Sequence, residues 1–253
     1  MSIDSSALTP EDIRRRVAEF EWYHTIDLGH GIKTPGTYDL APLVSHYGIP
    51  DSLAGQSVLD VGPAHGFFAF EFERRGAARV ATAELPDWSD HDGSPVLRHA
   101  FDQAPKLTET QDYHRGALGF AIAARGSRVE RQFCNVYDLT PERVGTYDTV
   151  FCASVLLHLS DPLRALYGMR RVCRGQAIIC TAIDTHLHVT HEPRALFVGT
   201  PEGQAFWFPT LKCLEMMALA AGFAHVEPVS AFALRSVDGQ FDTPHGTIRA
   251  FVD

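Results

Sequence analysis

Residues 58–67 read Val-Leu-Asp-Val-Gly-Pro-Ala-His-Gly-Phe, and this run constrains the fold more than any other stretch of the chain. A short apolar segment carries an acid, a glycine-bearing turn follows, and a helix is predicted to begin after it. In an open α/β sheet, the turn after the first strand is where an adenosine-containing cofactor binds. Gly62 permits a tight turn, and Gly66 opens the helix. The run therefore predicts a doubly wound sheet that binds a cofactor at its carboxyl edge.

The spacing of this turn favours a cationic ligand. It reads D-x-G-x-x-x-G, whereas a pyrophosphate-binding turn reads G-x-G-x-x-G. A carboxylate at Asp60 would repel a pyrophosphate, but it suits the ammonium and sulfonium groups of S-adenosylmethionine. The alternative is an α/β turn that binds no nucleotide. The cofactor contacts predicted in this run are Asp60, Gly62, Pro63, Ala64, His65 and Gly66.

A second acid follows at the end of the next predicted strand. Residues 79–83 form that strand, and Glu84 comes where a ribose-binding acid belongs, accepting hydrogen bonds from two hydroxyl groups. Leu85, the next residue, is also predicted to contact the cofactor. A glycine turn alone is weak evidence, but the turn, both acids and the helix in register predict a specific cofactor class.

The rest of the chain alternates strand and helix, which indicates an α/β protein with a mostly parallel, Rossmann-like sheet of about seven strands. The tail beyond residue 222 is predicted to add an antiparallel edge. We expect residues 1–55 to form an N-terminal helical cap or lid, in which residues 22–28 alternate like a strand, and residues 56–253 to form the cofactor-binding domain. Strands are expected at 57–61, 79–84, 128–133, 147–153 and 177–183, helices at 10–20, 39–47, 66–75, 109–125, 162–173 and 209–221, and helix-ending glycines at Gly76, Gly126, Gly175 and Gly222.

Charge and composition limit the class of partner. The net charge is −9 and only three of the 253 residues are lysines, whereas nucleic-acid binding is dominated by phosphate neutralisation. A small-molecule acceptor is therefore favoured over nucleic acid. No apolar run approaches the about 20 residues needed to span a bilayer, and no signal peptide is apparent. Five scattered cysteines suit a reducing compartment, so we expect a cytoplasmic protein without membrane contact. The oligomeric state stays open, a homodimer included.

These segments resemble the class I S-adenosylmethionine-dependent methyltransferases. Residues 59–66 are similar to their first motif, with Pro63 and Ala64 where Cys-Gly is usual, and Glu84 matches their ribose acid. The resemblance implies the same fold, with S-adenosylmethionine as the methyl donor.

Two further segments extend the resemblance to the rest of the cofactor site. Residues 134–139 are similar to the segment that holds adenine, which implies contacts from Asn135, in the place of a common aspartate, and from Val136. Residues 147–158 are similar to the fourth strand and its active-site end, which implies a cofactor contact from Ser154.

Two other stretches, residues 22–36 and 206–210, resemble a narrower branch that contains the tRNA wobble-uridine carboxymethyltransferases. The chain departs from that branch where the carboxyl group of carboxy-S-adenosylmethionine is held. Leu157 replaces a tyrosine, no equivalent lysine precedes Lys33, and residues 243–247 occupy the expected arginine region. We therefore expect methyl rather than carboxymethyl donation.

Histidines are the candidates for a catalytic base, since their ordinary pKa of about 6.5 suits proton transfer near neutrality. His158 follows the fourth predicted strand at the edge where ligands bind; its alternative role is to shape the pocket. His24 lies in the N-terminal extension beside aromatic residues, with structural packing as its alternative.

The predicted substrate contacts are spread over loops. They are Tyr23, Asp184, His186 and Trp207. In an extended segment Asp184, His186 and His188 would share one face and could bind zinc. Because sulfonium methyl transfer needs no metal, we favour a polar loop that lines the substrate pocket and expect no metal.

The sequence therefore predicts an S-adenosylmethionine-dependent methyltransferase that acts on an oxygen or nitrogen atom of a small, secondary-metabolite-like molecule of natural-product biosynthesis. In-line transfer would need alignment, exclusion of water and, for some acceptors, a histidine base. The alternatives are a tRNA-modifying methyl- or carboxymethyltransferase and a cofactor-binding protein without transfer activity.

Overall fold

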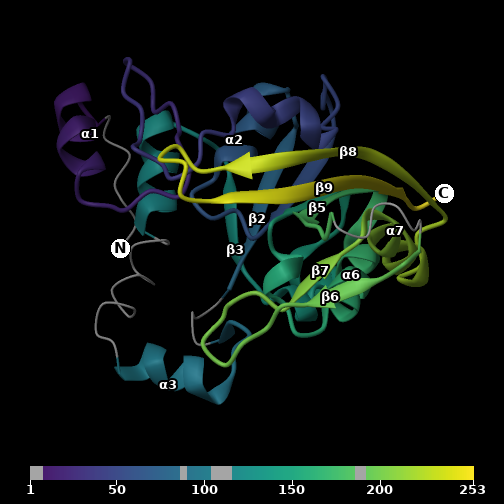
Figure 1. Ribbon diagram of the computed structural model, residues 1–253. Helices are drawn as coiled ribbons and strands as arrows, with labels where there is room; N and C mark the ends of the chain where they lie inside the picture. The colour runs from purple at the N-terminus through teal and green to yellow at the C-terminus, as the bar shows by residue number, and fades with distance from the viewer. Residues whose placement is uncertain (1–7, 86–89, 104–115, 186–191) are drawn as a thin grey trace.

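The computed structural model describes residues 8–85, 90–103, 116–185 and 192–253. Its main sheet has seven strands in the order β3-β2-β1-β4-β5-β9-β8 (Figure 1). The first five run parallel, and β9 is antiparallel to both of its neighbours, which confirms the predicted fold class. The strands are β1 Ser57–Val61, β2 Arg79–Glu84, β3 Glu130–Phe133, β4 Tyr147–Ala153, β5 Cys173–Ala182, β8 His225–Arg235 and β9 Asp242–Phe251, and a separate hairpin joins β6 Ala195–Phe197 to β7 Trp207–Pro209.

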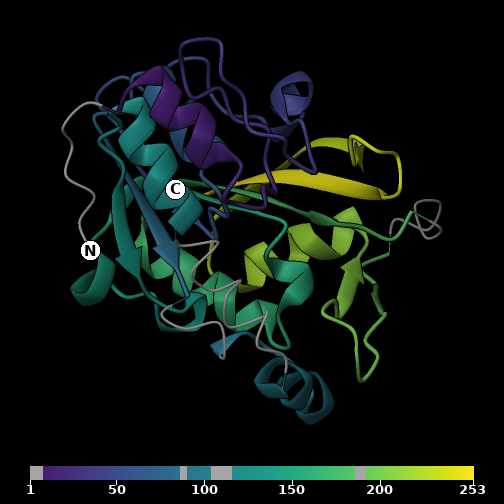
Figure 2. The ribbon, with the colours of Figure 1, turned by 90° about the vertical axis from the view of Figure 1, so that its left-hand side faces the viewer.

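Helices cover both faces of the sheet, each over its own hydrophobic cluster (Figures 1 and 2). One face carries the N-terminal segments, α2 and the helical residues 116–125; the other carries α6 and α7. In both views α3 lies apart from the body of the sheet. The helices are α1 Pro10–Val17, η1 Ala41–Tyr47, α2 Phe67–Arg74, α3 Pro95–Gln103, η3 Val136–Asp138, α5 Pro141–Val144, η4 Leu156–His158, α6 Pro162–Val172 and α7 Leu211–Ala220.

The central position of β1 places the cofactor turn. Val58 and Asp60 pair with Thr149 and Phe151 of β4 on one side, while β2 pairs on the other. Strand order reverses between β1 and β4, and in open α/β sheets ligands bind at such a switch point, beyond the carboxyl ends of the strands. The turn after β1 therefore opens at the place where a ligand is expected.

The predicted strand at residues 22–28 is wrong, although its alternation is real. Trp22, His24, Ile26 and Leu28 are all buried, yet the segment makes only isolated bridges, such as that between His24 and Tyr38. These side chains alternate because one face packs on the core shared with α2, not because a neighbouring strand pairs with them.

Glycines end three of the predicted helices, but not the fourth. Gly76, Gly126 and Gly222 follow helices with positive φ, as C-terminal caps do. Gly175 instead lies inside β5, which begins directly after α6, and a Cβ there would come 2.7 Å from the carbonyl oxygen of Asp148. This glycine allows close approach of β5 to β4.

The helix α3, Pro95–Gln103, was not predicted from the sequence, which gave no helix between residues 75 and 109. Within the described segments no helix is long and apolar enough to cross a bilayer.

Candidate active site

The turn after β1 is tightly closed against the segment that follows β4. Gly62, Ala64 and Gly66 all have positive φ, at 71°, 45° and 90°. The Gly62 N–H donates to the Ala83 carbonyl at 3.0 Å. A Cβ on Gly62 would lie 2.5 Å from Cγ2 of Val155, so both conformation and contact require glycine there.

Ala64 holds a left-handed conformation that costs an L-residue about 1–2 kcal/mol. Ala64→Gly is therefore expected to raise the free energy of unfolding by about 1 kcal/mol, measured by urea denaturation. Ala165→Gly in α6 is the control, and it should lower stability by about 1 kcal/mol or more, because Ala165 is buried in an ordinary helix. A loss of stability in both variants would contradict the assigned strain.

Asp60 is buried beneath this turn, with its side chain only partly satisfied. The residue is 2% exposed and its Oδ2 has no hydrogen-bond partner, while the Ala69 backbone N–H at the start of α2 bonds to the carboxylate. Burial raises the pKa of Asp60 from 3.8 to about 8; the Ala69 N–H opposes this shift and the charge of Glu84 adds to it. A ligand cation beside Oδ2 would stabilise the ionised carboxylate, so this site fits the ammonium or sulfonium of S-adenosylmethionine.

Glu84 ends β2 as predicted, and its carboxylate is held by Arg131 of β3. Arg131 Nε donates to Oε1 at 2.9 Å, Nη2 donates to Oε2, and Thr82 Oγ1 also donates to Oε1 at 2.9 Å. A carboxylate has about four acceptor positions, so Oε2 retains one for a ribose hydroxyl. Accepting a second ribose hydroxyl would require Thr82 or Arg131 to yield its position.

The predicted adenine segment follows β3 and borders a polar cavity of about 570 Å³. Asn135 caps η3 by accepting from the Tyr137 N–H at 3.1 Å, and its Nδ2 donates to the Asp90 carbonyl. Val136 is buried, and Leu85 comes directly after β2. The segment thus lies where the resemblance places it, with its contacts to adenine remaining a prediction.

The N-terminal extension is attached to the cofactor turn through His65. Its Nδ1 accepts from the Tyr23 backbone N–H at 2.8 Å, and its ring packs edge-on against Trp22. His24 lies beside it, buried among the rings of Phe67, Phe68 and Tyr23. This aromatic packing accounts for the position of His24; its role as a base stays a prediction.

His158, the other predicted base, lies in η4 beyond β4. Its Nδ1 is 2.9 Å from the Gln204 carbonyl, and because a carbonyl only accepts, Nδ1 carries the proton and Nε2 is left as an acceptor. Burial lowers the pKa of His158, although the bond to Gln204 opposes this. The neutral ring can accept a proton, and the His91 ring lies 5.8 Å away, tilted by 57°.

The end of β4 carries a contact that the sequence did not predict. Ser154 has a φ of 54°, and its Oγ is 3.1 Å from Nε2 of His245 on β9. His245 Nδ1 is in turn 2.9 Å from the Thr243 carbonyl. The two residues are 91 positions apart. The one available sequence signal was that residues 243–247 depart from the expected arginine region.

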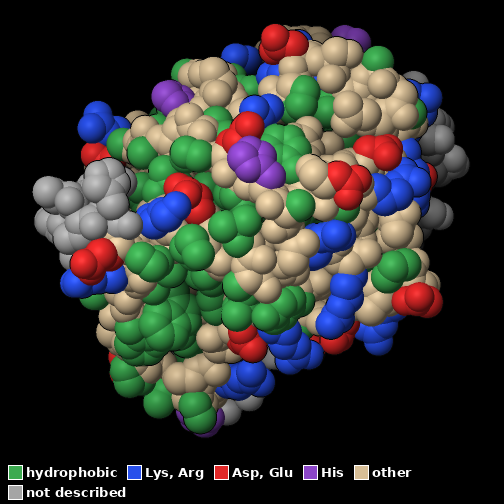
Figure 3. Space-filling model, turned by 90° about the vertical axis from the view of Figure 1, so that its right-hand side faces the viewer, with side chains coloured by type: hydrophobic (Ala, Val, Ile, Leu, Met, Phe, Trp, Pro, Cys, Tyr) green, Lys and Arg blue, Asp and Glu red, His purple; other side chains and the backbone are tan. Residues whose placement is uncertain are grey.

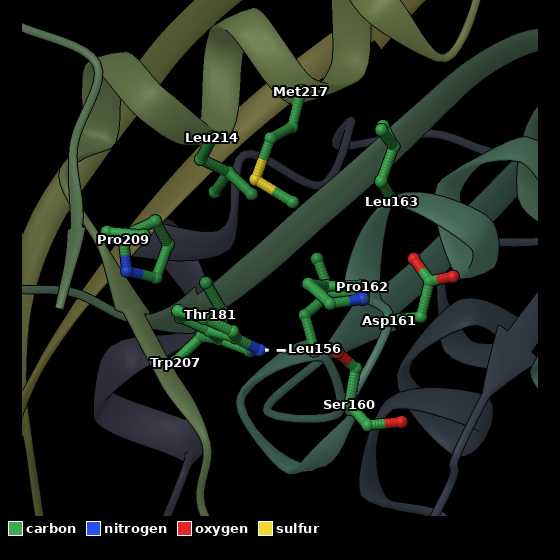
Figure 4. Close-up of a pocket in the computed structure, with 11 residues that line it drawn as sticks. Leu156, Ser160, Asp161, Pro162, Leu163, Thr181, Trp207, Pro209, Leu214 and Met217 are labelled. Atoms are coloured by element: carbon green, nitrogen blue, oxygen red, sulfur yellow. Dashed lines mark hydrogen bonds between the residues drawn. The ribbon is translucent and has the colours of Figure 1, made fainter. Parts of the chain in front are cut away.

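An apolar cavity of about 190 Å³ lies between α6, α7 and β7 (Figure 4). Trp207 lines it and donates from Nε1 to the Ser160 carbonyl at 3.4 Å, while its contact with a substrate remains a prediction. Hydrophobic side chains also gather on the face that is at the right in Figure 1 (Figure 3). The cavity is lined by Leu156, Ser160, Asp161, Pro162, Leu163, Thr181, Ala195, Trp207, Pro209, Leu214 and Met217.

The structure describes only one of the three side chains that could form a zinc-binding face. Asp184 is buried after β5 and its N–H donates to the Pro209 carbonyl at 3.0 Å, whereas His186 and His188 lie outside the described residues. Among the residues whose positions are described, no three histidine, cysteine or acidic side chains are grouped to hold a metal.

Comparison with known proteins identifies the family. A family model for a methyltransferase domain matches residues 36–227. The chain belongs to this methyltransferase family. The predicted methyltransferase domain is thereby confirmed, and S-adenosylmethionine remains its predicted cofactor.

Relatives of known name fall in two groups. The tRNA U34 carboxymethyltransferase of Azotobacter vinelandii (strain DJ / ATCC BAA-1303) is 26% identical over 79% of this chain and 55% of its own length. The ubiquinone biosynthesis O-methyltransferase of Vibrio parahaemolyticus serotype O3:K6 (strain RIMD 2210633) is 26% identical over 67% of this chain and 63% of its own. The chain thus spans little more than half the length of these relatives. The first group matches the narrower resemblance that the sequence suggested.

Among solved structures, the N-terminal domain of EvdMO1, determined in the presence of SAH and D-fucose, superposes with a TM-score of 0.61. It is 16% identical and the match covers 98% of both chains. At this identity the likeness shows the fold alone.

Proposed function

We propose that this chain transfers a methyl group from S-adenosylmethionine to an oxygen or nitrogen atom of a small, ring-containing molecule of the secondary-metabolite type. The observation that carries the choice of acceptor is the apolar cavity beside η4. A cavity of about 150 Å³ holds a benzene molecule, so about 190 Å³ accommodates one six-membered ring. The apolar side chains around it suit such a ring better than they suit a phosphate backbone.

The chain's own residues would supply binding and alignment. Asp60 holds the cationic part of the cofactor and Glu84 the ribose, while Trp207 positions the acceptor ring. His158, with Nε2 available, contacts the acceptor at the open edge of the site. When bound, the cofactor supplies an activated methyl group, so catalysis rests mainly on alignment and exclusion of water.

A tRNA acceptor is the second candidate, because the relative that aligns with 79% of the chain is a tRNA-modifying enzyme. The two acceptors differ in a measurable property. RNA binding would weaken steeply as salt rises, since it depends on phosphate neutralisation. The net charge of −9 argues against it.

The test is methyl transfer to a panel of phenols, catechols and deoxysugars, followed by mass spectrometry. Binding to unmodified bulk tRNA is measured alongside, from about 20 to 200 mM salt. We expect a methylated small molecule and no RNA binding at the lowest salt. Trp207→Ala should raise the KM for the acceptor about tenfold while leaving S-adenosylhomocysteine binding unchanged. Salt-dependent tRNA binding together with methylated tRNA would overturn the proposal.

A further inference from the structure

The strained residue at the end of β4 and a buried histidine of β9 form a hydrogen-bonded pair with a defined direction. Thr243 contributes a carbonyl oxygen, which only accepts, so Nδ1 of His245 must carry the ring proton. Burial favours the neutral ring by lowering the pKa of His245, although the bond to Thr243 opposes this. Nε2 then has a lone pair, and the Ser154 hydroxyl donates to it across 3.1 Å.

The protein keeps this arrangement at a cost. Ser154 has a φ of 54°, a backbone conformation that residues other than glycine rarely adopt and that is found preferentially at functional sites. Its N–H is fixed by the Cys180 carbonyl of β5 at 2.9 Å. His245 is 3% exposed, whereas Ser154 is only half-buried, so the serine hydroxyl is the end of the pair that a ligand can reach.

The pair also lies beside the cofactor turn. Val155, the residue after Ser154, is the one that packs against the Cβ position of Gly62. Leu156, one residue further, lines the apolar cavity. Ser154 is therefore close along the chain both to the residue that closes the cofactor turn and to the candidate acceptor pocket.

We propose that Ser154 and His245 form a proton relay that accepts the proton of an acceptor hydroxyl group during methyl transfer. This inference rests on the proposed function and narrows the acceptor atom to oxygen. The acceptor O–H bond breaks and an O–CH₃ bond forms, while the sulfonium loses its methyl group and becomes a thioether. The acceptor proton moves to Ser154 Oγ as the serine proton moves to His245 Nε2. The imidazolium, still bonded to Thr243, later releases its proton to solvent.

Ser154 would touch the acceptor, and His245 acts through it. His245→Gln keeps a side chain that can hydrogen bond but cannot take up a proton. It is expected to lower kcat at least about 100-fold, with the KM and S-adenosylhomocysteine binding nearly unchanged. His225→Gln is the matched control, since His225 lies at the other end of the β8–β9 hairpin and should leave kcat unchanged.

A structural role and a relay differ in their dependence on the acceptor. With a more acidic, nitro-substituted analogue of the acceptor, the fall in kcat caused by His245→Gln should be at least tenfold smaller. The hydroxyl group of such an analogue ionises without a base. An equal loss with both acceptors would overturn the relay. If His158→Gln lowered kcat and His245→Gln kept full activity, the acceptor proton would be assigned to His158 instead.

Nitrogen-15 NMR of histidine-labelled protein tests the pair without an acceptor. His245 should show the tautomer with hydrogen on Nδ1, and Ser154→Ala should shift the Nε2 resonance. Hydrogen on Nε2, or no shift in Ser154→Ala, would overturn the relay whatever the acceptor. The expected NMR result with no methyl transfer to any panel member would refute the proposed function, while supporting the directed hydrogen bond.

Discussion

Asp60→Asn is expected to weaken S-adenosylmethionine binding about 100-fold, equivalent to about 2.7 kcal/mol. The variant keeps the size of the side chain and its acceptor for the Ala69 N–H, but it removes the charge that the buried Oδ2 can offer to a cation. Calorimetric titration with S-adenosylmethionine measures the change. Asp148→Asn is the control, because Asp148 bonds to Ser57 at the start of β1, away from the carboxyl edge.

Proton release provides a second readout of the same site. The pKa of Asp60 is about 8, so at pH 7 most of the ligand-free protein carries a protonated carboxyl group. Binding a cation favours ionisation, and about one proton should be released, measured by calorimetry in two buffers of different ionisation enthalpy. Asp60→Asn should release none. Binding of equal strength in wild type and Asp60→Asn, with no proton release, would contradict the assignment of Asp60.

The same raised pKa predicts how stability depends on pH. The folded protein binds this proton more tightly than the unfolded chain does. The contribution of Asp60 to the free energy of unfolding is therefore full below pH 3.8 and is lost as pH rises to about 8. The loss is at most about 1.4 kcal/mol per pH unit. Asp60→Asn should therefore become more stable relative to wild type between these pH values.

Gly36→Ala is expected to lower the free energy of unfolding by at least about 3 kcal/mol. A Cβ on Gly36 would lie 2.0 Å from both the His24 carbonyl carbon and the Thr25 nitrogen, where no rearrangement of side chains can make room. The two segments would have to separate, and the bond from the Thr25 N–H to the Tyr38 carbonyl would break. Urea denaturation measures the loss.

The control for this substitution is Gly31→Ala in the same extension. Gly31 has a φ of 70° but nothing within 4 Å of its Cβ position, so only conformational strain of about 1 kcal/mol is expected. Cofactor affinity should also fall in Gly36→Ala, because the extension holds His65 through the Tyr23 N–H. Equal losses of stability at Gly31 and Gly36 would show that the contact with His24 is not as close as described.

Much of the sheet could be predicted because its central strands are buried on both faces. β1, β2 and β4 have the predicted bounds, since parallel central strands form nearly continuous apolar runs. β3 begins two residues later than predicted, at Glu130, and alternates weakly because it lies at the edge of the sheet. The start of β5 was missed because the strand follows α6 without a loop.

The contacts within the candidate site were less accessible to sequence reasoning. Asp60 and Glu84 could be located from the spacing of a turn and two strands. The ion pair of Glu84 depends instead on the register between β2 and β3, which aligns Thr82 with Arg131. His245 reaches Ser154 only because β9 pairs with β5 so that Ala182 lies opposite His245. No local pattern encodes either register.

The strand that carries His245 is late in the chain yet interior to the sheet. β9 lies between β5 and β8, so the five parallel strands have an unpaired edge at β5 until residues 242–251 are added. Without β9, the edge of β5 would be open, and such edges promote association with other chains. Ser154 meets its partner only after that edge is covered. The pairing that covers the edge of β5 is thus the same pairing that brings His245 to Ser154.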